Sequence, residues 1–179
     1  DLPNGLFRAL IVSHDQSGQI IENDKVRGVT LTGSDKAGAV VAQQAAKVLK
    51  KTVMELGSND AFIVLDDADL ELAAATCAYA RLYNNGETCV AAKRFVVVDS
   101  VYDKFRELLI EKFKGYSVGD PMQESTDVGP MSSTKQRDTL QQQMQESIDK
   151  GAKIAYSSEL DSSLSKEGAF HPLVILENI

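Results

Sequence analysis

The feature of this 179-residue sequence that most constrains its fold is the alternation of short β-rich runs with longer segments whose apolar residues recur at helical spacing. Strands are predicted at 5–13, 27–33, 52–56, 93–100, 152–157 and 171–178, and residues 61–71 are predicted to form a strand that runs into a helix. Helices are predicted at 35–51, 70–84, 100–116 and 132–150, with a Ser-rich loop near 157–168. This alternation is typical of a largely parallel sheet covered by helices on both faces, so the predicted fold class is α/β.

Two of the predicted helices have candidate N-terminal caps. Ser34 or Asp35 would cap the helix at 35–51, and Asp67 or Asp69 would cap the helix that follows residue 69. Each cap directly follows a predicted strand. The sequence therefore predicts strand–turn–helix units, which are the building blocks of a parallel α/β sheet.

Composition excludes several classes of function. The net charge is −7 and the pI about 4.9, with no basic stripe, so nucleic acid is not an expected partner. Two cysteines and two histidines are too few for a disulfide framework or a four-ligand zinc site, so no metal is expected and a reducing compartment fits best. The longest apolar stretch, residues 70–83, is interrupted by Glu71 and Arg81 and is too short to span a bilayer. We therefore expect a cytoplasmic protein without a membrane partner.

Cys89 is the candidate nucleophile because of its surroundings. It follows an Asn-Asn-Gly-Glu turn, and such turns leave backbone N–H groups unpaired that can stabilise a thiolate, or the oxyanion formed when a thiolate attacks a carbonyl. Cys77 lies among alanines in a predicted helix and is expected to be an ordinary buried side chain. A packing role for Cys89 is the alternative, since cysteines in apolar contexts are usually buried.

Two strand ends carry further candidates. Glu55 ends a hydrophobic strand and precedes Gly57, where the backbone can turn sharply, and a carboxylate at the end of a parallel strand faces the edge where ligands bind. The alternative for Glu55 is a solvated surface carboxylate. Gly33 and Ser34 join a strand to a helix, and a helix N-terminus there suits a phosphate, although the segment is neither a GxGxxG fingerprint nor a P-loop.

The histidines leave a second chemistry open. His14 and His171 lie near opposite ends of the chain and have no evident carboxylate or amide to orient them. A Cys–His hydrolase is therefore an alternative without support from spacing, and both residues are expected to be ordinary loop or surface histidines.

Three motifs, taken in order, resemble the aldehyde dehydrogenase superfamily. "VTLTGSDKAG" resembles its Phe-Thr-Gly-Ser cofactor loop, "MELGSNDAF" its Glu-Leu-Gly-Gly general-base motif, and "YNNGETCVAAKR" its Asn-x-Gly-Gln-x-Cys nucleophile motif. "VGDPMQESTDVGPM" and "GAFHPLVIL" are similar to later segments of the family, so the resemblance extends over essentially the whole chain. Within the family, the sequence is most similar to bacterial NAD(P)-dependent succinate-semialdehyde dehydrogenases.

The resemblance implies a mechanism for the two candidate residues. Cys89 would attack an aldehyde, its own backbone N–H would help to hold the oxyanion, and hydride would pass to NAD or NADP. Glu55 would activate the water that hydrolyses the resulting thioester to a carboxylic acid, and partial burial would suit it to that role. Gly33, Ser34, Leu56 and Gly57 would contact the cofactor. The alternative is that the chain is a non-catalytic fragment or degenerate homologue that serves packing or subunit contact.

The resemblance also predicts a domain organisation. Residues 1–57 would form the second half of a Rossmann-like nucleotide-binding domain and residues 58–179 an α/β catalytic domain that is incomplete at its C-terminus. The chain resembles only the middle of a family member, and the full-length protein is expected to be a homo-oligomer, a dimer or a tetramer. Two residues depart from the motifs: Ser58 replaces a second glycine, and Glu87 replaces a glutamine. An ionised Glu87 beside the thiol would disfavour the thiolate and slow attack.

Overall fold

The computed structural model describes residues 3–161, 164 and 168–179. These form two compact units, Asp1–Ser58 and Asn59–Ile179. Five residues of the predicted Ser-rich loop, 162–163 and 165–167, lie outside the described residues.

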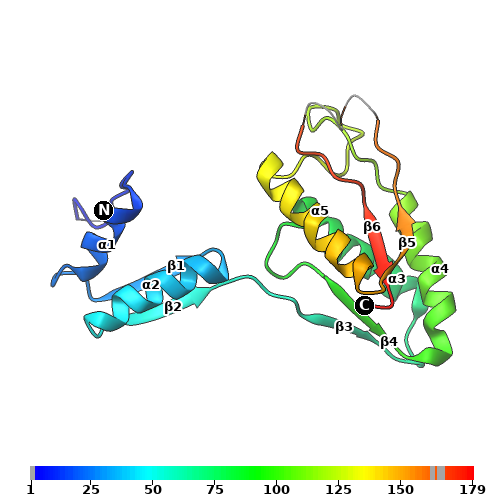
Figure 1. Ribbon diagram of the computed structural model, residues 1–179, viewed down its shortest axis with the longest axis horizontal. Coiled ribbons are helices and arrows are strands. Elements are labelled where there is room, and N and C mark those ends of the chain that lie inside the picture. The colour runs from blue at the N-terminus through cyan, green and yellow to red at the C-terminus, as the bar shows by residue number, and fades with distance from the viewer. Residues whose placement is uncertain (1–2, 162–163, 165–167) are drawn as a thin grey trace. The chain divides into compact units, whose positions relative to one another are not determined.

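The first unit is a small strand–helix–strand element preceded by a helix. Its elements are α1 (His14–Glu22), β1 (Gly28–Thr32), α2 (Asp35–Lys47) and β2 (Lys51–Glu55). β1 and β2 pair in parallel, with Gly28 opposite Lys51 and Thr32 opposite Glu55 (Figure 1). The carboxyl ends of both strands therefore meet at one edge of this sheet.

Local sequence signals explain where α2 begins and ends. Of the two predicted caps, Ser34 is the one observed: its hydroxyl accepts a hydrogen bond from the Ala37 N–H at 3.2 Å. After Lys47 the chain turns through Leu49, which has a left-handed backbone with φ of 56°. β2 then starts at Lys51, one residue before the predicted strand.

The strand predicted at 5–13 is wrong in this structure. These residues form turns and irregular backbone, and Leu10 and Ile11 are exposed at 65% and 106%. Among the described residues of this unit, β1 pairs with β2 and no third strand joins them. An extended segment without a hydrogen-bonding neighbour is not stable as a strand, which explains the difference.

The second unit contains three larger helices and four strands among its described residues. Its elements are β3 (Ala61–Val64), α3 (Leu70–Leu82), η1 (Tyr83–Gly86), β4 (Arg94–Val97), η2 (Asp99–Val101), α4 (Tyr102–Lys114), α5 (Thr134–Asp149), β5 (Lys153–Ser157) and β6 (Val174–Glu177). β3 and β4 pair in parallel, whereas β5 and β6 pair in antiparallel (Figure 1). Asp69, the second of the two predicted caps, begins α3.

The α/β class is confirmed, and two of the three strand pairs in the described residues are parallel. Each pair is a two-stranded sheet, and the third pair is antiparallel. Just beyond the paired residues of β5 and β6, two further hydrogen bonds join the same two segments. The Ser158 N–H donates to the Leu173 carbonyl and the Leu173 N–H donates to the Ser158 hydroxyl, both at 2.9 Å.

The core of the second unit lies between α3, α4 and the β3–β4 pair. Cys77 and Leu82 of α3 pack with Phe105, Leu109 and Phe113, which recur along one face of α4 as predicted. Residues 70–84 are apolar on most sides, a pattern that predicts a helix buried between layers. The opposite face of α3 is nevertheless exposed, with Leu72 at 65% and Tyr79 at 58%. Within the described ranges, no helix combines the length and the apolar character that a membrane span requires.

Candidate active site

Four of the predicted site residues meet in the first unit, at the carboxyl edge of the β1–β2 pair. Glu55 is the last residue of β2, and its carbonyl accepts a hydrogen bond of 3.0 Å from the Gly33 N–H. Ser34 follows as the cap of α2. Leu56 then packs against α2 at Gly38, where an added Cβ would lie 2.6 Å from a Leu56 methyl group. Glycine at position 38 thus permits this close packing of α2 on the segment after β2.

The structure differs from two expectations for this edge. Gly57 has no positive φ, so its backbone conformation does not demand a glycine. The Glu55 side chain is exposed in this chain, and the partial burial expected for a general base is not present.

Cys89 lies in the second unit, just after an unusual backbone segment. Asn84, Asn85 and Gly86 have φ of 52°, 58° and 70°, three successive residues in the left-handed region. Asparagine and glycine adopt this region more readily than other residues, which explains the composition of the turn. We call residues 83–89 the cysteine loop.

The two cysteines have opposite environments, and the burial predicted for Cys77 is observed. Cys89 is exposed and Cys77 is buried, and neither forms a disulfide. Burial raises the pKa of the Cys77 thiol. Among the described residues, the backbone N–H of Cys89 donates no hydrogen bond, so it can serve a bound group.

The chain after Cys89 is held against α3. Ala91 and Ala92 are buried, and the Ala92 N–H donates to the Ala80 carbonyl at 3.2 Å. Such close approach of two backbones requires small side chains. The Lys93 ammonium donates to the Cys89 carbonyl at 3.0 Å, which joins the two ends of residues 89–93.

Three side chains tie the cysteine loop in place. The Arg81 guanidinium donates to the Gly86 carbonyl at 3.0 Å, and burial lowers the pKa of Arg81. The Asn85 side-chain amide accepts from the Gly129 N–H and donates to the Pro130 carbonyl, and the Glu87 carboxylate accepts from the Ser132 N–H at 3.1 Å. The sequence predicted none of these contacts. For Asn85 and Glu87 the reason is distance, because their partners lie more than 40 residues further along the chain.

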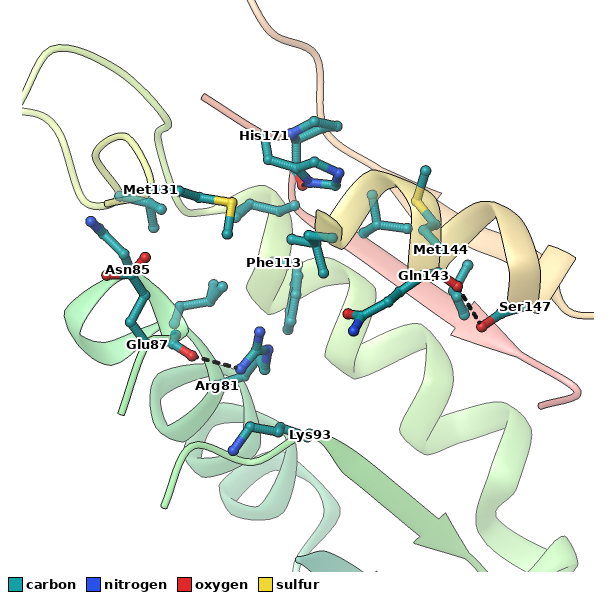
Figure 2. A pocket seen from close by; sticks show the side chains of 18 of the residues that line it. Arg81, Asn85, Glu87, Lys93, Phe113, Met131, Gln143, Met144, Ser147 and His171 are labelled. Atoms are coloured by element: carbon teal, nitrogen blue, oxygen red, sulfur yellow. Dashed lines mark hydrogen bonds between the residues drawn. The ribbon is translucent and has the colours of Figure 1, made fainter. Parts of the chain in front are cut away.

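A cavity of about 680 Å³ lies beside the cysteine loop within the second unit. Figure 2 shows Arg81, Asn85 and Glu87 on one side of it and Gln143 and Met144 of α5 on the other. Cys89 does not line this cavity. The thiol is exposed elsewhere on the surface of the loop.

His171 is engaged away from the candidate nucleophile. Its Nδ1 lies 2.8 Å from the Pro172 carbonyl oxygen, and its Nε2 lies 3.2 Å from the Gln141 side-chain oxygen. These contacts join His171 to α5 and give no support to a pairing with Cys89.

The comparisons with known proteins define the family. The model of the aldehyde dehydrogenase family matches residues 1–179. An aldehyde dehydrogenase of Paenarthrobacter nicotinovorans is 37% identical over 177 residues, or 99% of this chain. A succinate-semialdehyde dehydrogenase [NADP(+)] of Deinococcus radiodurans is 45% identical over 153 residues, or 86% of this chain. The chain belongs to the aldehyde dehydrogenase family.

The solved structures agree with the sequence comparison. The crystal structure of succinic semialdehyde dehydrogenase from Streptococcus pyogenes, in complex with NADP+, has a TM-score of 0.86 and 42% identity to this chain and covers 93% of it. This chain spans 36% of that structure, and 38% and 32% of the length of the two relatives. It therefore corresponds to about a third of the length of each of these three proteins.

Proposed function

We propose that the protein containing this chain oxidises an aldehyde to a carboxylic acid, with Cys89 as the nucleophile and Glu55 as the base. The observation that carries the proposal is an exposed thiol whose own backbone N–H is unpaired within the described residues. A thiolate that attacks a carbonyl generates an oxyanion next to that N–H, which is the arrangement that stabilises a tetrahedral intermediate. The family membership of the chain supports the same chemistry.

The role of Glu55 rests on its place in the sheet. It ends β2 beside Gly33 and Ser34, at the edge where parallel sheets bind ligands. Its carboxylate would accept a proton from the water that hydrolyses the Cys89 thioester, and so release the acid. Because the two residues belong to different units, this role is a proposal about the assembled protein.

A nicotinamide dinucleotide, NAD or NADP, is the proposed cofactor, and when bound it supplies the hydride acceptor. The residues of the first unit fit such a group: Gly33 and Ser34 open α2, and a helix N-terminus favours a phosphate. Leu56 and Gly57 follow at the neighbouring strand end and would form the adjacent wall. The Streptococcus pyogenes structure contains NADP+, which supports the choice of cofactor class.

Variants of Cys89 and Glu55 test the two roles separately in the full-length protein. Cys89→Ala should lower kcat by at least about 1,000-fold, because the nucleophile is lost, whereas Cys77→Ala should retain most of the activity. Glu55→Gln should give a first burst of NADH or NADPH of about one per Cys89, followed by slow turnover, because only hydrolysis of the thioester is impaired. Full turnover by Cys89→Ala would remove Cys89 from the reaction.

Succinate semialdehyde is the proposed substrate, since relatives of this chain are named for its oxidation. The test compares kcat/KM for succinate semialdehyde with that for butanal, which has the same chain length but no carboxylate. A preference of about tenfold or more for succinate semialdehyde is expected, and a preference for butanal would assign a different aldehyde.

The non-catalytic alternative is favoured by one observation. Phe7 and Ile11 in the irregular segment at 5–13 are exposed at 84% and 106%, so this segment presents apolar surface that packing or a subunit contact would cover. Two measurements on this chain would support the alternative: a circular dichroism spectrum that shows an intact fold, and calorimetry that detects no binding of NAD or NADP. We further propose that the full-length protein is a cytoplasmic homo-oligomer. Sedimentation of the full-length protein would test its oligomeric state.

A further inference from the structure

The cysteine loop has a backbone that needs external support. A left-handed backbone costs a non-glycine residue about 1 kcal/mol, less for asparagine than for most others, and Asn84 and Asn85 both adopt it. A loop with such a conformation persists when surrounding groups determine it more strongly than the strain opposes it.

Asn85 supplies that support through both ends of its side-chain amide. Its Oδ1 accepts from the Gly129 N–H at 2.8 Å, and its Nδ2 donates to the Pro130 carbonyl at 3.1 Å. The amide therefore pairs with backbone groups of two consecutive residues. Asn85 is half-buried, so these bonds are partly shielded from competing water.

The segment that receives Asn85 is itself anchored. The Ser132 N–H donates to Glu87, two residues before Cys89, and the Met131 N–H donates to the Ala169 carbonyl at 2.9 Å. Residues 129–132 thus connect the cysteine loop to the chain near residue 169. This connection also bears on Glu87, the residue that replaces the usual glutamine: its carboxylate takes the role of a hydrogen-bond acceptor, which an amide oxygen could equally fill.

We propose that Asn85 is a positioning residue that fixes the cysteine loop on Gly129 and Pro130 and thereby sets where the Cys89 thiol and its backbone N–H are presented. This inference rests on the proposed function of Cys89. A displacement of about 1 Å in a reacting group can lower a catalysed rate by about 100-fold, so a clamp on this loop would influence kcat.

Two variants of Asn85 separate the clamp from the backbone conformation. Asn85→Gly permits the left-handed backbone and removes both hydrogen bonds, whereas Asn85→Asp retains the acceptor for Gly129 and places a second oxygen against the Pro130 carbonyl. Gln142→Ala is the matched control, because Gln142 is exposed and its side-chain amide, within the described part of the chain, bonds only to Glu146 on the same helix.

The two cysteines provide a readout that does not depend on aldehyde oxidation. In the full-length protein, alkylation of Cys89 by iodoacetamide at pH 7 should slow about threefold or more in both Asn85 variants, because the loop that presents the Cys89 thiol is no longer held. Cys77 is buried in the core and labels only when the unit opens, so its protection should not change. Loss of positioning is thereby distinguished from loss of folding.

Kinetics complete the test. We expect kcat for aldehyde oxidation to fall by about tenfold or more in both variants, while KM for the cofactor stays within about twofold and Gln142→Ala behaves as the wild type. If the wild type oxidises no aldehyde, the proposed function fails, but the alkylation rates still test the clamp. The inference would be overturned if Cys89 in Asn85→Gly were alkylated at the wild-type rate. It would also be overturned if faster labelling of Cys77 showed that unfolding accounts for the whole effect.

Discussion

At the residue scale, the environments of the two cysteines lead to a direct prediction. Cys89 is exposed on its loop, whereas Cys77 is 4% exposed in the core of the second unit. Iodoacetamide should therefore label Cys89 faster than Cys77 by at least about tenfold, because Cys77 reacts only after local opening. Mass spectrometry of peptides from a time course measures both rates in one sample. Equal and slow labelling of the two would contradict an activated Cys89 thiol.

Within the cysteine loop, Gly86 occupies a position where any residue with a side chain would be strained. Its φ is 70°, and an added Cβ would lie 2.7 Å from the Arg81 carbonyl oxygen. We expect Gly86→Ala to lower the free energy of unfolding by about 3 kcal/mol, through backbone strain and steric overlap together.

Gly151 is the matched control for that variant. It also has a positive φ, 114°, but nothing lies within 4 Å of an added Cβ, so Gly151→Ala should cost only the backbone term of about 1 kcal/mol. Urea unfolding of both variants gives the comparison. Equal losses would show that the approach of Arg81 to Gly86 has no energetic consequence.

At the element scale, Lys50 joins α1 to the α2–β2 turn. Its ammonium donates to the Ile21 carbonyl, at the end of α1, and to the Asn23 carbonyl just beyond it. A cation at this position also interacts favourably with the negative end of the helix dipole. The pattern of residues 15–23 is only weakly helical, and this contact over 29 residues helps to explain why α1 forms.

Lys50→Met should therefore destabilise the first unit by about 2 kcal/mol, since two charge-assisted hydrogen bonds are lost. Hydrogen exchange should show faster exchange in α1 and unchanged protection in α3 and α4. Lys25→Met, which alters an exposed lysine after the same helix, is the control. Unchanged exchange in α1 would mean that these bonds do not hold the helix.

At the scale of the whole second unit, one ionic group joins β6 to α4. The Glu177 carboxylate accepts from the Arg106 guanidinium at 2.6 Å and from the Tyr102 hydroxyl at 3.1 Å (71 and 75 residues away in the sequence). The bond from Arg106 lowers the pKa of Glu177, and the bond from Tyr102 contributes in the same direction. The pKa of Tyr102 is raised, by burial first and by its hydrogen bond to Glu177 second.

The lowered pKa of Glu177 sets the sign of a pH dependence. The contribution of Glu177 to stability is complete above the pKa of an unfolded glutamate, about 4.3, and is lost as the pH falls through the lower folded value. The thermal midpoint of Glu177→Gln should therefore lie below that of the wild type at pH 7, and the difference should shrink below about pH 4. A constant difference between pH 7 and pH 3 would contradict the linkage.

Features that depend on nearby residues were predicted from the sequence more accurately than features that depend on distant ones. The caps at Ser34 and Asp69, the apolar face of α4 and the burial of Cys77 were predicted correctly, because each depends on neighbours within a turn or two. The strand at 5–13 was wrong, because a strand forms only where a second segment offers backbone partners.

The same difference between local and long-range signals applies to the candidate site. The sequence by itself determined the candidate groups, namely a cysteine after an Asn-Asn-Gly turn and a glutamate at a strand end, because residue type and local backbone depend on adjacent residues. Only the tertiary structure decided what holds the cysteine loop. The partners of Asn85 and Glu87 lie at residues 129–132, and no local pattern encodes which distant backbone groups will meet a side chain once the core has packed.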